Sequence, residues 1–294
     1  MKTQVIGNVR IDRLVESEGP FAAADFLLPD IDSALLDEHA HWLSPLFVES
    51  ASRKIIMSFH SLVIRTPRHV ILVDCCVGND KQRPLRPGWH EQQFPYLARL
   101  ANLGLTPEDI DFVFCTHLHA DHVGWNTRLI DGRWVPTFPN ARYVFAKKEY
   151  DYWDKANQQH SGDDPLNHGC FADSVQPIID ARLAELVSDS YQFDDTIWFE
   201  PAPGHTPGLI IVHIRDNNEH AVLTGDVMHT PVQLANPELS SRFCLDPDQS
   251  RLTRTALIHR YAETDTLILP GHFPSPTAGH IVPLGNSFCY RCNH

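Results

Sequence analysis

The densest group of chemically active side chains in the sequence is His117, His119, Asp121 and His122, four potential metal ligands within six residues. They begin where an apolar run, Phe112–Cys115, ends, and loops at strand ends commonly carry functional residues. Side chains alternate along an extended segment, so His117 and His119 are expected to point to the same side, while Asp121 and His122 face a second position. Imidazole nitrogen and carboxylate oxygen suit zinc, iron or manganese. The segment therefore predicts a metal site.

Three further segments each offer one ligand directly after a turn or an apolar run. His205 lies in Gly-His-Thr-Pro-Gly, Asp226 in Thr-Gly-Asp and His272 in Gly-His-Phe. Each of the three follows a glycine, which lets the backbone turn and approach other groups closely. Any one of them alone would be an ordinary loop residue. The four segments together, in this order, favour a shared site with more ligands than one metal needs.

These ordered motifs resemble the metallo-β-lactamase superfamily, and the resemblance runs from about Ser58 to Phe273. It implies an α/β fold of layered α+β type, an αββα sandwich with a metal site between the sheets at one edge. It implies one metal held by His117, His119 and His205, a second held by Asp121, His122 and His272, and Asp226 as the bridge between them. It also implies that Asp74, which closes the apolar run Val70–Val73, orients a ligand of the site.

The cofactors implied are two divalent metal ions, with Zn²⁺ the first choice. Two such ions about 3.5–4 Å apart can share a bridging water and lower its pKa towards neutrality, which gives a hydroxide nucleophile without Ser or Cys. Five neutral imidazoles and two carboxylates bring a charge of −2 against +4 from the two ions, so the site as a whole stays cationic. A cationic site favours the binding of a carbonyl or phosphoryl oxygen. Asp121 and Asp226 are the candidates for passing a proton to the leaving group, and the residues do not choose between them.

Within the superfamily, the sequence resembles the methyl parathion hydrolase-like and acyl-homoserine-lactone lactonase group. It looks closer to the methyl parathion hydrolase-like members and their lactonase or esterase relatives, because acyl-homoserine-lactone lactonases usually have a shorter stretch before the histidine that corresponds to His205. The features that carry this resemblance are the long N-terminal extension, an insertion over residues 147–191 and the ending Gly-His-Phe-Pro at residues 271–274. Lactonases often have a tyrosine three residues after the bridging aspartate. This chain has His229 there, which either donates a hydrogen bond to the same substrate oxygen, with a charge that depends on pH, or is a rim residue without a catalytic role.

The predicted wall of the substrate pocket consists of Trp125, Met228, His229 and Phe273. Trp125 follows His122 by three residues and Phe273 adjoins His272, so both should lie near the metals. An apolar pocket around a cationic metal pair suits a neutral small molecule. The leading hypothesis is therefore a dinuclear metallohydrolase that uses the bridging hydroxide on a lactone, carboxyl ester or phosphotriester.

Other functions fit parts of the same pattern. A β-lactamase or a thioesterase of the glyoxalase II kind is the alternative among enzymes. A non-catalytic metal-binding or ligand-sensing module is a remote alternative, because pseudoenzymes usually lose ligands and all seven are present here. An oxygen-reducing flavo-di-iron protein would normally have a glutamate in the first motif and a flavin domain, and the sequence has neither.

Strands and helices alternate from about residue 55, which favours a layered α/β protein with two sheets and outer helices. No linker rich in Pro, Gly or Ser divides the chain, so we expect one domain over residues 1–294, with about 1–54 as an irregular apolar extension packed on it. The expected strands are 55–59, 61–64, 70–74, 112–115, 142–145, 210–214, 221–224 and 266–269, and the expected helices are 91–103, one starting at Thr106-Pro107, 148–157 and 248–262.

Composition excludes several classes of protein. With 24 Lys and Arg against 37 Asp and Glu the net charge is −13, which argues against nucleic acid or an anionic membrane as partner. A hydrophobic fraction of 43% is enough for a sizeable core. Seven cysteines, an odd number, and the lack of a signal-like or membrane-spanning run predict a cytoplasmic protein. The expected partner is a small-molecule substrate, and the family resemblance suggests a homodimer.

Overall fold

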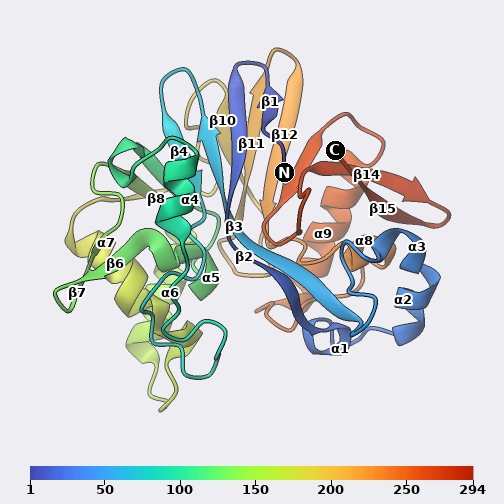
Figure 1. Cartoon of the computed structure of the whole chain (residues 1–294), viewed down its shortest axis with the longest axis horizontal. Helices are drawn as coiled ribbons and strands as arrows, with labels where there is room; N and C mark the ends of the chain where they lie inside the picture. The colour runs from blue at the N-terminus through green and yellow to red at the C-terminus, as the bar shows by residue number, and fades with distance from the viewer. Residues whose placement is uncertain (294) are drawn as a thin grey trace. The chain divides into compact units, whose positions relative to one another are not determined.

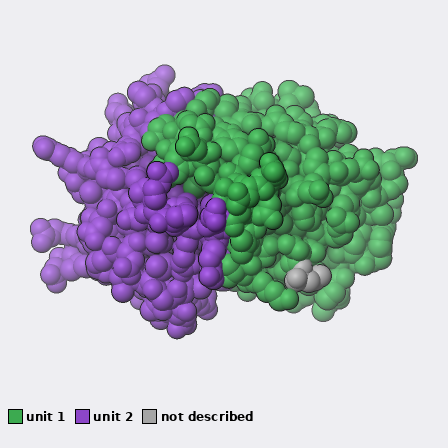
Figure 2. Space-filling view, turned by 90° about the horizontal axis from the view of Figure 1, so that it is seen from above, with its two compact units in different colours: residues 1–7, 18–58, 190–294 green, residues 8–17, 59–189 purple. Residues whose placement is uncertain are grey.

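The computed structural model describes residues 1–293, which group into two compact units (Figure 2). Unit 1 comprises residues 1–7, 18–58 and the chain from 190 onward, and unit 2 comprises residues 8–17 and 59–189. Both are mixtures of strands and helices, as the alternating pattern predicts. The single domain with an N-terminal extension stays a prediction.

A seven-stranded sheet contains the strand that leads to the first histidine motif. Its order is β1-β2-β3-β4-β5-β8-β9, and β4, β5, β8 and β9 run parallel. The middle strands are nearly continuous apolar runs, as expected where both faces are covered. Because β4 and β5 are parallel, Asp74 and Thr116, which follow them, emerge at the same edge. The strands are β1 Gln4–Ile6, β2 Val9–Ala23, β3 Lys54–Arg65, β4 Val70–Val73, β5 Phe112–Cys115, β8 Arg142–Ala146 and β9 Ala184–Val187.

Short helices and one hairpin complete unit 2, and Figure 1 shows them in green to yellow. Their buried side chains form one apolar cluster with the interior of the sheet. The elements are α4 Tyr96–Asn102, η1 Pro107–Asp109, α5 Ala120–Val123, η2 Gly124–Asn126, β6 Thr127–Ile130, β7 Arg133–Pro136, α6 Lys147–Gln159, η3 Leu166–Gly169, η4 Phe171–Val175 and α7 Gln176–Asp180.

A six-stranded sheet organises unit 1, with order β10-β11-β12-β13-β14-β15. Neighbours are antiparallel except for β12 and β13, which are parallel. It follows that β10, β12 and β13 all run in one direction and end at the same edge. The strands are β10 Ile197–Pro201, β11 Ile210–Asp216, β12 Glu219–Gly225, β13 Leu267–Pro270, β14 Gly279–Leu284 and β15 Ser287–Cys292.

Five helices belong to the same unit. The helix α9 begins at a strong start signal, because Pro247 occupies its first position and the Asp246 carboxylate accepts from Gln249 N at 2.9 Å. In Figure 1 the helix α3 lies near the β14–β15 hairpin, and Phe47, which follows α3, packs on Tyr290 of β15. The helices are α1 Ala24–Leu27, α2 Ser33–Glu38, α3 Ala40–Leu43, α8 Val232–Ala235 and α9 Pro247–Tyr261.

The structure corrects several expectations about local structure. The N-terminal residues are not irregular throughout, because β2 is a strand of 15 residues. The two strands expected at 55–59 and 61–64 form the single strand β3. The helix expected from Thr106 is only the one turn η1, since the chain enters β5 three residues later. The hairpin β14–β15 was not predicted at all.

The loop that follows β4 contains a buried basic group. The Lys81 ammonium donates to Thr127 Oγ1 at 2.7 Å and lies 3.7 Å from the centre of the Trp134 ring. Its nearest carboxylate oxygen, Asp173 Oδ1, is 3.6 Å away, and the same carboxylate binds Arg83 through two hydrogen bonds of 2.6 and 2.8 Å. Burial lowers the pKa of Lys81 to about 7.

This lowered pKa predicts a pH-dependent stability. Between pH 7 and the ordinary lysine value of 10.5, the unfolded chain binds a proton that the folded protein does not. Lys81 should therefore contribute a rise in the free energy of unfolding with pH in this window, by at most about 1.4 kcal/mol per pH unit. In urea unfolding between pH 7 and 8.5, below the range in which unfolded cysteines ionise, the slope of the free energy of unfolding against pH should be more positive in the wild type and in Lys148→Met, an exposed control, than in Lys81→Met. Equal slopes in all three proteins would contradict the assignment.

Candidate metal centre

Asp74 organises the loop that carries the first histidine motif. It follows β4 in a left-handed conformation with φ 59°, which is uncommon for a residue other than glycine. Its Oδ1 accepts from Thr116 N at 2.8 Å, and its Oδ2 accepts from Thr116 Oγ1 at 2.9 Å and from His122 Nδ1 at 2.9 Å. Asp74 therefore lies beside the candidate ligand His122, and its role in orienting a metal ligand stays a prediction.

These hydrogen bonds determine which nitrogen of each imidazole carries a proton. His122 donates from Nδ1 to a carboxylate, so its Nε2 keeps the lone pair. The Thr116 hydroxyl gives its proton to Asp74 and is left to accept from His117 Nδ1 at 3.1 Å, which leaves His117 Nε2 as an acceptor. That atom lies 3.1 Å from His119 Nδ1. Two imidazole nitrogens at this separation are suited to bind one cation.

The single-ligand segments follow the three strands that end at one edge of the six-stranded sheet. His205 comes after β10, Asp226 after β12 and His272 after β13. The turn before His205 requires a glycine, because Gly204 has φ 132° and a Cβ there would lie 2.2 Å from Ser250 N at the start of α9. Strand direction and this turn therefore bring the three side chains together.

The carboxylate of Asp226 is the centre of this second set. Its Oδ2 lies 3.3 Å from His205 Nε2, 3.3 Å from His229 Nε2 and 3.2 Å from His272 Nε2, and all four residues are buried. His272 donates from Nδ1 to Ser58 O at 3.1 Å, so its Nε2 faces Asp226 with a lone pair. A carboxylate surrounded by imidazole nitrogens is the donor chemistry of a transition-metal site.

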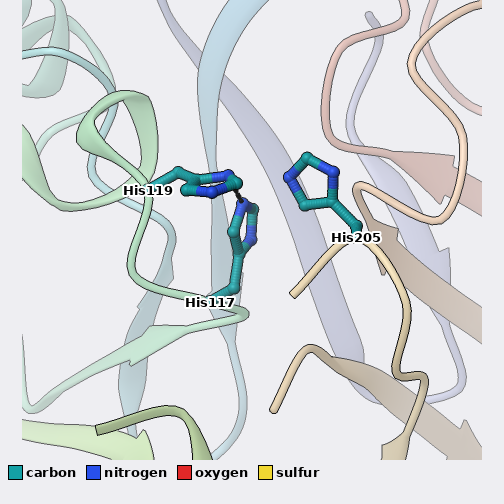
Figure 3. A group of neighbouring side chains, drawn as sticks. All are labelled: His117, His119 and His205. Carbon is teal, nitrogen blue, oxygen red and sulfur yellow. Dashed lines mark hydrogen bonds between the residues drawn. The ribbon is translucent and has the colours of Figure 1, made fainter. Parts of the chain in front are cut away.

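The predicted ligands fall into groups of donors. Within residues 1–293, four groups of three have donor atoms within 4.8 Å of one another, and Figure 3 shows the imidazoles of the first group turned toward one another. Together the groups contain all seven predicted ligands and add His229. The groups are His117, His119 and His205; His117, His122 and Asp226; Asp121, His122 and His272; and His205, Asp226 and His229.

The donor set fits zinc or a similar ion. It contains only imidazole nitrogens and carboxylate oxygens, and His117, His122 and His272 each have the other ring nitrogen engaged by a protein oxygen. Such partners are typical of metal-bound histidines, because they set the tautomer and the ring orientation. The assignment of individual ligands to individual ions stays a prediction.

The predicted pocket residues are all buried. Trp125 stacks on Tyr96 at 4.9 Å between ring centres, Phe273 packs on Phe47 and Tyr290, and Met228 belongs to the apolar core of unit 1. His229 differs from them, because its ring also faces His205 at 4.8 Å and belongs to a donor group. Contact of these residues with a substrate stays a prediction.

Glu16 is a residue of this region that sequence reasoning missed. It comes from β2 and is fully buried, and its carboxylate accepts from Val77 N at 3.1 Å, Gly78 N at 2.9 Å and Trp125 Nε1 at 2.7 Å. Burial raises the pKa of Glu16 to about 7, although these three donors act in the opposite direction. No local pattern reveals it, since its partners lie more than 60 residues away.

Comparison with protein families agrees with the motifs. The metallo-β-lactamase superfamily matches residues 60–272, well over half of the chain. The chain therefore belongs to the metallo-β-lactamase superfamily, as the ordered motifs predict. The matched range begins two residues after Ser58 and ends at His272, so it includes every predicted ligand.

Two curated relatives within the superfamily match parts of the chain. The N-acyl homoserine lactonase AttM of Rhizobium radiobacter is 26% identical over 181 residues, which are 60% of this chain and 63% of the lactonase. The probable metallo-hydrolase YybB of Bacillus subtilis is 24% identical over 139 residues, 47% of this chain and 54% of that protein. The chain thus spans less than two thirds of the length of these relatives. The first of them supports the predicted lactonase-like group.

Solved structures confirm the fold. The hydrolase AbOPH of the β-lactamase superfamily superposes with a TM-score of 0.81 at 21% identity and covers 99% of this chain and 97% of its own. AidC, a dizinc quorum-quenching lactonase, gives a TM-score of 0.78 at 21% identity over 100% of this chain and 97% of its own. The predicted fold class, the αββα sandwich of the metallo-β-lactamase type, is confirmed.

Proposed function

We propose that this protein is a dinuclear metal-dependent hydrolase that opens lactones, or cleaves carboxyl esters or phosphotriesters, of rather apolar small molecules. The observation that carries the proposal is the set of donor groups, which contains five histidines and two aspartates in the family's order, with His229 as an addition. One ion would be held by His117, His119 and His205 and the other by Asp121, His122 and His272, with Asp226 shared between them.

When bound, a pair of divalent ions supplies a water of lowered pKa and polarises the oxygen that the water attacks. The chain's own residues hold the donors in place and handle protons. Asp74 fixes His122 and the loop around it, and Ser58 O fixes His272. Asp226 and Asp121 are the carboxylates able to pass a proton to the leaving group. His229 Nε2, 3.3 Å from Asp226 Oδ2, is placed to donate a hydrogen bond beside that carboxylate.

A neutral lactone is the substrate class that we favour. The curated relative AttM and the solved relative AidC are named as lactonases, and AidC is named as a dizinc protein. Buried apolar residues are close to the candidate ligands in the sequence, with Phe273 directly after His272 and Met228 two residues after Asp226. Such surroundings favour an acyl lactone over a highly charged phosphodiester.

Metal removal tests the proposal directly. Dialysis against a chelator should abolish hydrolysis, and zinc, cobalt or manganese should restore it, with about two ions bound per chain by elemental analysis. The assay is a panel of an acyl-homoserine lactone, paraoxon, an acyl thioester and nitrocefin. Highest kcat/KM on the lactone is the expected result, whereas highest kcat/KM on the thioester or nitrocefin would favour the alternative functions. Equal turnover without any metal would refute the proposal.

The proposed partner is the small-molecule substrate. No helix in the described part of the chain is long and apolar enough to cross a membrane. A cytoplasmic location and a homodimer remain predictions, which fractionation and light scattering would test.

A further inference from the structure

The peptide groups of Leu118, between His117 and His119, are bound by side chains from the insertion over residues 147–191. Its N–H donates to Glu149 Oε1 at 3.1 Å, and its C=O accepts from Asn167 Nδ2 at 2.8 Å. Because β5 has already ended, the backbone here has no strand partner, and a buried peptide group needs another. The insertion supplies all of the partners, because Cys170 Sγ also donates to Leu118 O, at 3.5 Å.

Asn167 also holds the next peptide group along the loop. Its Oδ1 accepts from Ala120 N at 3.2 Å. Ala120 is the first residue of α5, and the residue before it, His119, makes no capping hydrogen bond with its side chain. The N–H groups of a first helical turn lack partners within the helix. A single amide thus binds the peptide groups on both sides of His119.

Glu149 links the loop to the helix α6. The same Oε1 that accepts from Leu118 also accepts from Trp153 Nε1 at 2.7 Å, one turn further along the helix. The Trp153 ring meets the His119 ring edge-on with centroids 5.5 Å apart. Both Glu149 and Trp153 are buried. The helix therefore restrains the imidazole of His119 as well as its backbone.

The backbone of Asn167 has an unusual conformation. Asn167 and His168 are consecutive non-glycine residues in the left-handed region, with φ 47° and 56°. Asparagine accepts this region more readily than most residues, but two in succession persist only where other contacts hold them. Arg83 provides one such contact, because its Nη1 donates to His168 O at 2.9 Å. The strained turn coincides with the residue whose amide reaches the loop.

We propose that Glu149 and Asn167 are positioning residues for the metal centre. They fix the peptide planes around His119, so that His119 Nδ1 stays 3.1 Å from His117 Nε2 and the two nitrogens face one ion together. A loop that is ordered before binding does not lose conformational freedom when the ion enters. The inference rests on the proposed function. It gives the insertion over residues 147–191 a role, which is to raise the affinity for metal without contributing a ligand.

Substitutions that spare the fold test this role. In Asn167→Gly both side-chain hydrogen bonds are lost, while glycine adopts a positive φ without strain. Zinc affinity, measured by competition with a chromophoric chelator, should fall about tenfold, and the melting temperature of the metal-free protein should stay close to wild type. Glu149→Ala should lower the affinity similarly. Glu149→Gln keeps the oxygen that accepts from Leu118 N and Trp153 Nε1 and should restore it.

Asn157→Ala is the matched control. Its amide also lies in the insertion, but it donates to Trp153 O at 2.8 Å within α6 and does not bind the loop. Zinc affinity and the visible spectrum of the Co²⁺ form should be unchanged in this variant and altered in Asn167→Gly. Wild-type affinity in both Asn167→Gly and Glu149→Ala would overturn the inference alone. A wild-type protein that binds no zinc, cobalt or manganese would overturn the proposed function and the inference together.

Discussion

Asp226→Ala is expected to lower kcat/KM for the best substrate by at least about 10³-fold, the scale of losing a group that acts directly on the reacting centre. The carboxylate is buried among three imidazoles, each with Nε2 within 3.3 Å of Oδ2. Without it, the nitrogens of His205, His229 and His272 face one another with no negative charge between them. Bound zinc should fall from about two ions per chain to one or fewer.

The comparison variants separate loss of charge from loss of fold. Asp226→Asn keeps the shape and one oxygen but removes the charge, so it should retain more metal than Asp226→Ala while losing most activity. Asp265→Ala removes an exposed carboxylate just before β13 and should keep wild-type activity and metal content. Melting temperatures of the metal-free proteins should be similar. An Asp226→Ala protein with two zinc ions and near-normal kcat/KM would show that Asp226 is not a shared ligand.

The candidate ligands could be predicted from the sequence because each of the four segments that carry them follows the end of a strand. The apolar run Phe112–Cys115 is visible as a buried strand, and the histidines begin two residues later. Asp226 and His272 likewise follow β12 and β13, which the structure shows to be parallel and to end together. The end of a strand can be recognised from neighbouring residues alone. The order of the motifs then indicated that these residues share one site.

The residues that support those ligands could not be predicted in the same way. Glu149 and Asn167 bind the loop, and Glu16 binds Trp125, through contacts across 31 to 109 residues of sequence. A single acid or amide in a helix or strand has no local signature. The strand β2 was missed for a related reason. Its polar residues are paired with distant partners, as in the ion pair of Asp12 with Arg65. The sequence of β2 therefore lacks the alternation of apolar and polar residues that indicates a strand with one solvent-facing side.

Asp74→Asn is expected to lower kcat/KM by about 10³- to 10⁴-fold through one exchanged atom. Asparagine tolerates the positive φ of this position as aspartate does, so the backbone should not change. The side-chain oxygen of the new asparagine must occupy the position of Asp74 Oδ1, because Thr116 N–H donates a hydrogen bond to that position at 2.8 Å. An NH₂ group there would place two donors against each other. The NH₂ group then faces His122 Nδ1 and donates to it. His122 is left with its proton on Nε2, where it cannot bind a metal.

The size of this effect follows from the tautomer, since the comparable Asp-to-Asn exchange behind the histidine of a serine protease, a known system, costs about 10⁴-fold in kcat with the geometry intact. Zinc affinity should fall about 10- to 100-fold, and high zinc should recover only part of the activity. Asp111→Asn, the same exchange where a carboxylate accepts from Val70 N at the other end of β4, is the control and should leave both quantities unchanged. If Asp74→Asn retained wild-type zinc affinity and kcat/KM, Asp74 would not set the tautomer of His122, and His122 would bind its ion without help from β4.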